Sequence, residues 1–286
     1  MSDVQELRSE PAVTERADTA ARIQPGGFFV ELSLDWIVRR ASENVHRLLG
    51  QSHVTLIDEP LGRFVQSQAL HDLRNLFSRL SGTTGIARAY AVRLTDDPDL
   101  FDIAFQLRGG RVLLEAIPSE GAYGECFGTV GGLIAGLADN RGQSLLDGGA
   151  RRMRALTGHD RVTLIYGDRR AESSRAAFAG SSEMTDDVPT IVGDTEAEPV
   201  AIFPRQSAET SAQGALLRCC DATAAEALRR EGVRASLRVP FSVNDVNGEF
   251  RCDSRVPRAP SFELHAAAEL FAQLFALRLE IDQLKG

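Results

Sequence analysis

The chain has 286 residues, enough for two ordinary domains that each bury a hydrophobic core. It is 43% hydrophobic and 25% charged, as globular proteins are, and its formal net charge is −8. Its basic side chains are scattered, which excludes the basic stripe of a nucleic-acid-binding protein, and no apolar run approaches the roughly 18 residues that span a membrane.

Residues 1–22 are predicted to form a polar amino-terminal arm without the apolar core of a secretory signal, so we expect a cytoplasmic protein. A first domain, 23–130, begins at Ile23-Gln24-Pro25-Gly26-Gly27 and alternates strand patterns with helix patterns. The predicted strands are 28–32, 36–38, 87–94, 101–107 and 111–117, and the predicted helices are 42–49 and 67–80. Three to five strands with helices on one side is a PAS-like order.

A second domain is predicted over 131–286, with an amphipathic helix at its start and a long helix at its end. Residues 171–213 are rich in Ser, Thr, Ala, Asp and Glu, and we expect an irregular segment there. The other predicted helices and strands follow in chain order: helix 144–157, strand 161–166, helix 223–231, strands 236–243 and 249–252, and helix 261–284. This is a GAF-like order, and the fold class is therefore α+β.

The terminal helix carries two apolar rows. Phe271 and Phe275 form one row, and the other is a heptad stripe. One row can pack on the domain core while the other pairs with a helix of a second copy, although both rows can also be intramolecular core. The stripe, which we expect to form a dimer helix, consists of Leu270, Leu274, Leu277, Ile281 and Leu284.

No enzyme motif occurs in the sequence: there is no P-loop, no GxSxG, no HExxH and no kinase signature. The cysteines Cys126, Cys219, Cys220 and Cys252 lack the spacing of a zinc site. We therefore expect no catalytic residue and no metal in this chain, and four reduced thiols.

The stretch 217–237, LRCCDATAAEALRREGVRASL, resembles the segment LRSVSPxHxEYLRNMGVxASM of bacterial phytochrome GAF domains. Four further matches occur in the right order. Residues 23–27 resemble IQPHG, 159–162 resemble FDRVM, 187–189 resemble the end of PASDIP, and 260–280 resemble the family's dimer-forming helix. The chain is identified as a divergent member of the bacteriophytochrome family.

The resemblance implies a PAS domain followed by a GAF domain, with the amino-terminal arm threaded through a loop of the GAF domain. This knot would place Ile23 and Pro25 inside the loop that follows Pro189. It also implies a homodimer through helix 261–284. In the full-length protein, a PHY domain and a histidine kinase would follow, with a response regulator as downstream partner. Neither nucleic acid nor membrane is an expected partner.

The pocket that binds bilin in the family is changed here. Ala12 stands where the family attaches bilin through a cysteine thiolate. Ala224 and Ala227 replace the pocket histidine and tyrosine, and Cys252-Asp253-Ser254 replaces a CHH motif, with Ser254 in place of the histidine that approaches the D ring. Asp187 and Arg218 remain. The resemblance therefore predicts that covalent bilin binding and photoconversion are lost and that no cofactor is bound.

Three alternatives remain open. The chain can be a thiol-based redox sensor in which Cys219 or Cys220 pairs with Cys252, although free cysteines are usually small buried hydrophobic residues. It can be a dimerisation scaffold whose former pocket is filled by side chains. It can also be a working red/far-red photoreceptor that binds biliverdin without a covalent bond.

Overall fold

The computed structural model describes residues 22–80, 85–120, 124–180, 188–205 and 214–285. The chain divides into two compact units. Unit 1 is made of 1–121, 187–189 and 197–225, and unit 2 of 122–186, 190–196 and 226–286. A stretch far along the sequence therefore joins the amino-terminal unit.

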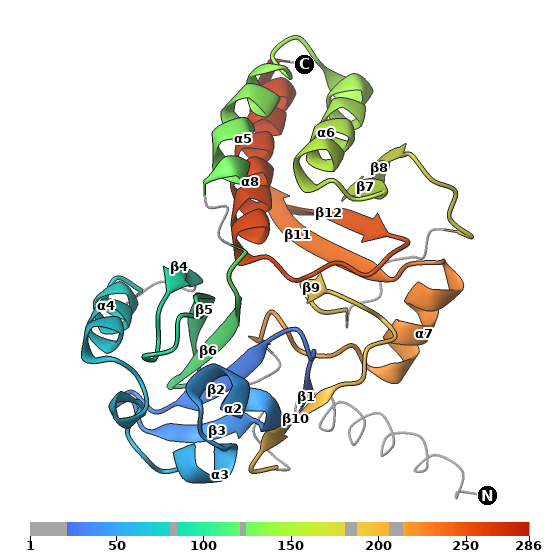
Figure 1. Ribbon diagram of the computed structural model, residues 1–286. Helices are drawn as coiled ribbons and strands as arrows, with labels where there is room; N and C mark the ends of the chain where they lie inside the picture. Colours follow the sequence, from blue (N-terminus) through green and yellow to red (C-terminus); the bar gives the residue numbers. More distant parts are fainter. Residues whose placement is uncertain (1–21, 81–84, 121–123, 181–187, 206–213, 286) are drawn as a thin grey trace, which may run out of the picture. The chain divides into compact units, whose positions relative to one another are not determined.

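Within the described residues, unit 1 is built on an antiparallel sheet of seven strands in the order β1-β10-β3-β2-β6-β5-β4 (Figure 1). The strands are β1 (Arg22–Ile23), β2 (Phe28–Leu32), β3 (Val38–Ser42), β4 (Ala87–Val92), β5 (Phe101–Arg108), β6 (Arg111–Pro118) and β10 (Val200–Phe203). The helices are η1 (Glu43–Val45), α2 (His46–Leu49), α3 (His53–Leu56), η2 (Leu61–Arg63) and α4 (Ser67–Ser78).

Both faces of the unit 1 sheet are buried, because successive side chains of a strand point to opposite faces. Phe28 and Val30 of β2 belong to the main core, together with Leu73 of α4. Phe29 lies on the other face, in a smaller cluster with Ile23 and Ile202. The strand β2, FFVEL, is therefore buried at every position.

The segment around Ile23 lies between two parts of the later chain. Ile23 pairs with Val200 of β10 on one side and with Arg218 on the other, and its side chain is fully buried. The Gln24 amide donates to the carbonyl oxygen of Leu217 at 2.9 Å, while Pro25 is exposed in the turn that follows. These pairings fit an apolar plug at Ile23. The passage of the arm through a closed loop stays a prediction.

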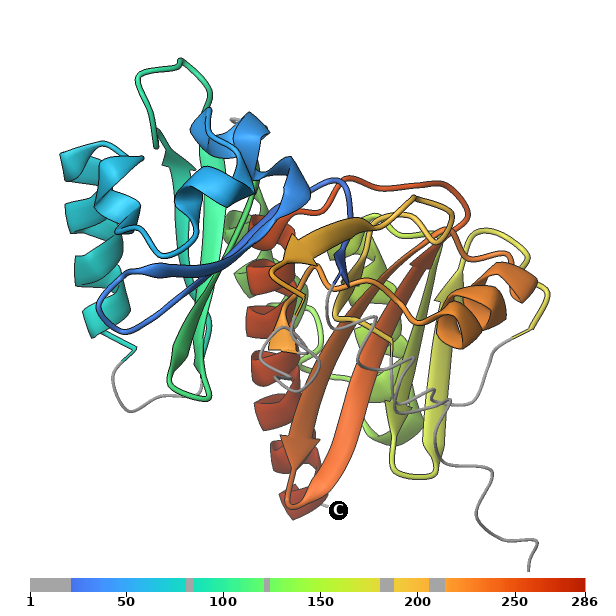
Figure 2. The same ribbon diagram turned by 90° about the horizontal axis from the view of Figure 1, so that it is seen from below.

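Unit 2 contains a second antiparallel sheet, in the order β8-β7-β12-β11-β9 within the described residues. Helices α6 and α8 contact this sheet, and α5 packs against both; Figures 1 and 2 show α8 running alongside β11 and β12. The strands are β7 (Arg161–Tyr166), β8 (Arg169–Ser174), β9 (Ile191–Val192), β11 (Ala235–Val243) and β12 (Val246–Ser254). The helices are α5 (Glu125–Ala135), α6 (Gly142–Thr157) and α8 (Phe262–Lys285). Helix α7 (Ala222–Arg230) crosses the division between the units, which falls after Ala225.

The predicted α+β architecture of antiparallel sheets with flanking helices is confirmed. Seven elements in the described residues are not predicted from the sequence: β1, α3, η2, α5, β8, β9 and β10. The strands β9 and β10 and most of β8 lie in 171–213, so the expectation of a wholly irregular segment there is wrong. Helix α5 has the glycine-rich sequence ECFGTVGGLIA, whose glycines disfavour a helix locally. Strand β8, RRAESS, buries only the small side chains Ala171 and Ser173, so it lacks an apolar alternation. Of the helices in the described ranges, none has the length and apolar character needed to cross a membrane.

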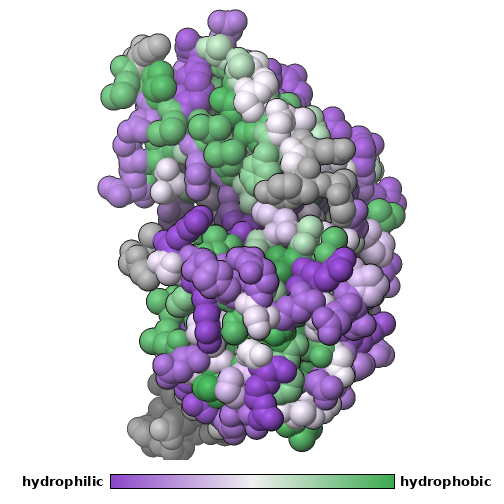
Figure 3. Space-filling view, turned by 60° about the vertical axis from the view of Figure 1, so that its left-hand side comes forward, coloured by the Kyte–Doolittle hydropathy of each residue, from purple (hydrophilic) through white to green (hydrophobic). Residues whose placement is uncertain are grey.

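Helix α8 separates its two apolar rows. Phe271 and Phe275 are fully buried against Phe250 of β12. On the predicted stripe, Leu274 is half-buried, and the remaining members are exposed: Leu270 37%, Leu277 56%, Ile281 46% and Leu284 81%. In Figure 3 apolar residues gather on the surface of unit 2 that carries α5 and α8. One row is therefore core, and the other faces outward.

Candidate functional site

The central strands of unit 2 bury charged side chains on the sheet face opposite α6 and α8. On β12, Phe250 packs its ring on Phe275 of α8, and Cys252 is hydrogen-bonded to Thr157 of α6. The intervening residues therefore point to the other face. Antiparallel pairing aligns residues of the neighbouring strands with them on that face. The polar residues gathered there are Arg161 and Thr163 of β7, Arg251 and Asp253 of β12, and Ser236 and Arg238 of β11.

Three of these side chains, Arg161, Arg251 and Asp253, form an arginine–carboxylate ring with Glu231, which directly follows α7 (Ala222–Arg230). The Arg161 Nη2 atom lies 3.0 Å from Glu231 Oε2 and 2.8 Å from Asp253 Oδ2. Arg251 contacts the same two carboxylates, with Nη2 at 3.0 Å from Glu231 Oε2 and Nε at 3.2 Å from Asp253 Oδ2. The ring thus alternates two cations with two anions.

The ring is almost completely removed from solvent. The side chain of Arg161 is 2% exposed, that of Arg251 4% and that of Asp253 0%. Ser236 adds a hydrogen bond, its Oγ donating to Asp253 Oδ1 at 2.9 Å. Burial alone would lower the pKa of Arg161, but the carboxylates of Asp253 and Glu231 outweigh it and raise the pKa. The two carboxylates therefore hold Arg161 in its charged form.

The chain after β8 covers the ring. The Phe178 ring lies 4.2 Å from the Arg161 guanidinium carbon, a cation–π contact. Arg161 also donates to the carbonyl oxygen of Gly180, and the Ala179 amide donates to the carbonyl oxygen of Glu231. The segment 178–180 is therefore anchored to the ring by its main chain and by one aromatic side chain.

A second ion pair extends the polar layer along the same face. Arg238 Nη1 lies 3.8 Å from Glu249 Oε2, and burial raises the pKa of Glu249. Nearby, burial lowers the pKa of His159 to about 4, with a further contribution from Arg258, so this imidazole is neutral at pH 7.

The structure places the predicted pocket residues as follows. Ala12 and Asp187 lie outside the described residues. Ala224 is buried and Ala227 half-buried on α7. Arg218 belongs to unit 1, where its main chain pairs with Ile23 and its carbonyl oxygen accepts from the Gln24 side chain at 3.1 Å.

The motif Cys252-Asp253-Ser254 is split between the two faces of β12. Cys252 lies toward α6, as its bond to Thr157 shows, and Ser254 Oγ accepts from Arg258, which also donates to the carbonyl oxygen of Thr157. Asp253 lies on the opposite face, in the ring. Cys252 and Ser254 are predicted pocket positions from the sequence, whereas the group of Arg161, Glu231, Arg251 and Asp253 is not predicted. Charges at alternate positions of a strand normally indicate a solvated face, so this pattern gave no signal of burial.

Within the described residues, the four cysteines are thiols that form no disulfide. Burial raises the pKa of Cys219 to about 12 and raises that of Cys252 as well, with Cys220 and Asp253 adding to the respective shifts. Cys126 and Cys220 are half-buried. Because the thiolate is the reactive form, the two buried thiols are held in their unreactive state at neutral pH.

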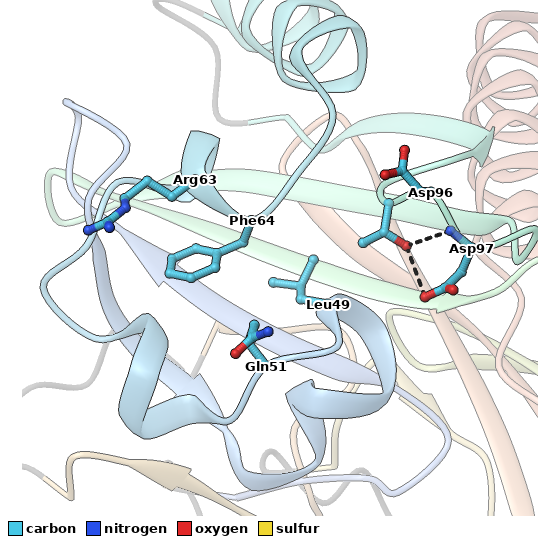
Figure 4. A pocket seen from close by; sticks show the side chains of 7 residues that line it. Leu49, Gln51, Arg63, Phe64, Asp96 and Asp97 are labelled. Carbon is cyan, nitrogen blue, oxygen red and sulfur yellow. Dashed lines mark hydrogen bonds between the residues drawn. The ribbon is translucent and has the colours of Figure 1, made fainter.

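Unit 1 has a pocket of about 430 Å³ on its surface (Figure 4). Its charged groups are engaged with neighbours: Arg63 pairs with Glu59, Asp96 accepts from Gln66, and Asp97 is hydrogen-bonded to Thr95. The pocket therefore presents no convergent set of polar groups. It is lined by Leu49, Gln51, Arg63, Phe64, Thr95, Asp96 and Asp97.

Comparison with known proteins agrees with this architecture. Residues 12–116 match a family model described as a PAS fold. The chromophore-binding domain of an unusual bacteriophytochrome from R. palustris superposes with a TM-score of 0.76 at 22% identity, over 98% of this chain and 100% of that one. The chromophore-binding domain of Stigmatella aurantiaca phytochrome P1 superposes with a TM-score of 0.74 at 22% identity, and the match covers 91% of this chain and 95% of that one. The fold is that of phytochrome chromophore-binding domains.

A comparison of sequences agrees with the comparison of folds. The chain is 25% identical over 295 aligned residues to a bacteriophytochrome from Pseudomonas aeruginosa. The alignment covers 90% of this chain and 39% of that protein. The chain is therefore similar in sequence to this bacteriophytochrome, and it spans about two fifths of the length of that relative.

Proposed function

We propose that the chain is the sensory input module of a bacteriophytochrome-like two-component signalling protein, and that it does not bind bilin covalently. The arginine–carboxylate ring is the observation that supports this proposal. The resemblance assigns 217–237 and the motif at 252–254 to the bilin pocket, and Glu231, Ser236 and Asp253 come from these two stretches. Pocket positions are thus occupied by buried ion pairs.

A bilin is planar and carries two carboxylates, so it needs free cations and an open face. On this sheet it would have to break ion pairs that are sealed from water. Removing one partner of a buried pair leaves an uncompensated charge and costs about 3–5 kcal/mol. Ala12 also offers no thiol for attachment. The ring therefore competes with the pigment for the same face.

Co-expression with heme oxygenase tests the proposal. The purified protein is expected to show no red or far-red absorption band and no photoconversion, because the face is filled and the thiol is missing. A bacteriophytochrome chromophore-binding domain produced in the same cells is the positive control. A pigment that remains after denaturation would overturn the proposal. A photoconverting pigment lost on denaturation would support the alternative of a photoreceptor that binds biliverdin without a covalent bond.

No observation favours the redox alternative, since the buried thiols of Cys219 and Cys252 are poor nucleophiles at neutral pH. The filled sheet face agrees with the scaffold alternative, in which the module passes on a signal through its helices. In the full-length protein that signal would reach a PHY domain, a histidine kinase and a response regulator. The proposed module contributes no catalytic residue of its own.

We further propose that α8 pairs with α8 of a second copy through its exposed stripe. The double substitution Leu277→Glu, Ile281→Glu is expected to raise the dimer dissociation constant at least about 100-fold, because each buried aliphatic side chain contributes about 1.5–3 kcal/mol. Light scattering coupled to gel filtration measures this change. Gln273→Glu, an exposed position of α8 outside the stripe, is the matched control. A monomeric wild-type protein at tens of micromolar, or a variant that remains fully dimeric, would contradict the proposal.

A further inference from the structure

Glu115 of β6 is a fully buried carboxylate in unit 1 that fixes a distant part of the chain. Its Oε1 accepts from the Leu217 amide at 2.7 Å and its Oε2 from the Leu216 amide at 2.9 Å. These amides lie about a hundred residues further along the sequence than the carboxylate. One side chain therefore holds two consecutive main-chain groups of the segment 214–218 on the sheet.

Other contacts hold the same segment. The Gln106 side chain donates to the carbonyl oxygen of Gly214 at 2.9 Å, and Leu217 accepts from the Gln24 amide. A Cβ placed on Gly27 would come within 2.2 Å of the Leu217 Cδ1 atom, so the segment lies tightly against the turn before β2. The chain continues from this segment into α7, which begins at Ala222.

The residues directly opposite Glu115 on the neighbouring strands are apolar. The residues paired with it across the sheet are Phe29 of β2 and Ala104 of β5, and Ala215 of the segment belongs to the apolar cluster on this face. Burial raises the pKa of Glu115 to about 7, against the lowering effect of its bonds to Leu216, Leu217 and Gln106.

The charged groups of the neighbouring elements do not pair with this carboxylate. In the described part of the chain, no arginine lies within the 4.0 Å of an ion pair with Glu115. On the same face, Glu31 of β2 is paired with Arg40 of β3 and Arg111 of β6, at 3.5 and 3.8 Å. The remaining charged residues of the elements around it are Arg22 of β1, Arg39 of β3, Arg88 of β4, Asp102 and Arg108 of β5, and Arg218 at the end of the segment. Arg108 donates to the Gln106 side chain at 3.3 Å.

We propose that Glu115 is a proton-controlled latch that holds the segment 214–218 on the unit 1 sheet when protonated and loosens it when the proton leaves. The protonated acid is neutral and is readily buried, and its carbonyl oxygen still accepts from a main-chain amide. The anion is buried with only dipoles around it, which is costly. Opening exposes the carboxylate to water and relieves that cost.

The direction of the pH dependence follows from linkage. In the closed form the pKa of Glu115 is about 7, and in an opened, hydrated form it returns toward the ordinary glutamate value of 4.5. The closed form therefore binds the proton more tightly, and its advantage is fully present below pH 4.5 and is lost as pH rises through about 7. A difference of this size between the pKa values of the closed and open forms changes the ratio of the two forms by up to about two orders of magnitude.

Hydrogen exchange of the Leu216 and Leu217 amides in the full chain tests the latch. After correction for intrinsic exchange rates, their protection is expected to fall at least tenfold between pH 5 and pH 8. In Glu115→Gln, which cannot titrate, the protection should not depend on pH. Glu120→Gln, an exposed carboxylate just after β6, is the matched control and should keep the wild-type dependence. Wild-type protection that stays constant over this range, or a pH dependence that persists in Glu115→Gln, would overturn the proposal.

A second measurement does not depend on whether the variant folds. The carbon-13 shift of the Glu115 carboxyl in the wild-type protein should titrate with a midpoint well above 4.5, together with the Leu216 and Leu217 amide shifts. A midpoint at or below 4.5 would show that the anion is the preferred buried form, and would exclude the latch.

Discussion

Asp253→Ala is expected to destabilise unit 2 by about 3–5 kcal/mol, because it leaves Arg161 and Arg251 buried with the single carboxylate of Glu231 between them. Urea unfolding followed by circular dichroism, with hydrogen exchange of β7 and β12, measures the loss. Trp36 is the sole tryptophan of the chain and lies in unit 1, so its fluorescence follows that unit separately. A much smaller shift in the tryptophan transition is expected.

Two further variants isolate the cause. Glu226→Ala removes an exposed carboxylate that pairs with Arg230 four residues along α7, and is expected to cost less than about 1 kcal/mol. The double variant Arg161→Met, Asp253→Ala removes one surplus cation together with the anion. It should be less destabilised than the sum of its two single variants. Equal costs for Asp253→Ala and Glu226→Ala would mean that the ring is not sealed from water.

Phe275→Ala is expected to destabilise unit 2 by about 3–5 kcal/mol, the usual cost of deleting a buried aromatic ring. Phe275 is fully buried, and its ring centroid lies 5.2 Å from that of Phe250 and 5.9 Å from that of Phe241. Leu277→Ala, two residues along the same helix but 56% exposed, should cost less than about 1 kcal/mol in the unfolding of the monomer. Denaturant unfolding of both variants measures the difference.

Gly149 of α6 lies against the Phe275 ring, so substitutions at both positions test the packing of α6 on α8. A Cβ on Gly149 would lie 2.4 Å from Phe275 Cε2, so Gly149→Ala overpacks the wild-type core. When Phe275 is alanine, the added methyl group enters vacated space, and the same substitution should stabilise the protein by up to about 1 kcal/mol through helix propensity. Additive effects of the two substitutions would show that α6 and α8 do not pack through this contact.

The ring and the latch share one feature that local sequence patterns do not contain. Asp253 and Arg161 are 92 residues apart, and Glu115 and Leu217 are 102 apart. Read locally, Glu249, Arg251 and Asp253 alternate with apolar residues and look like the solvated face of an amphipathic strand. Only the folded chain supplies the opposite charges that allow these residues to be buried. Asp253 pairs with Arg161 of β7, Glu249 with Arg238 of β11, and Arg251 with Glu231 after α7.

The amino-acid sequence by itself determined the α+β class, the order of the two sheets and the two-sided terminal helix. These depend on periodicities of two and of about 3.6 residues, which neighbouring residues set together. Tertiary structure decided that 197–225 joins the first unit, that four charged side chains close into a ring, and that Glu115 holds a main-chain segment. The reason is physical: burial of a charge is tolerable only where its partners converge, and the partners come from strands that meet only when the chain has folded.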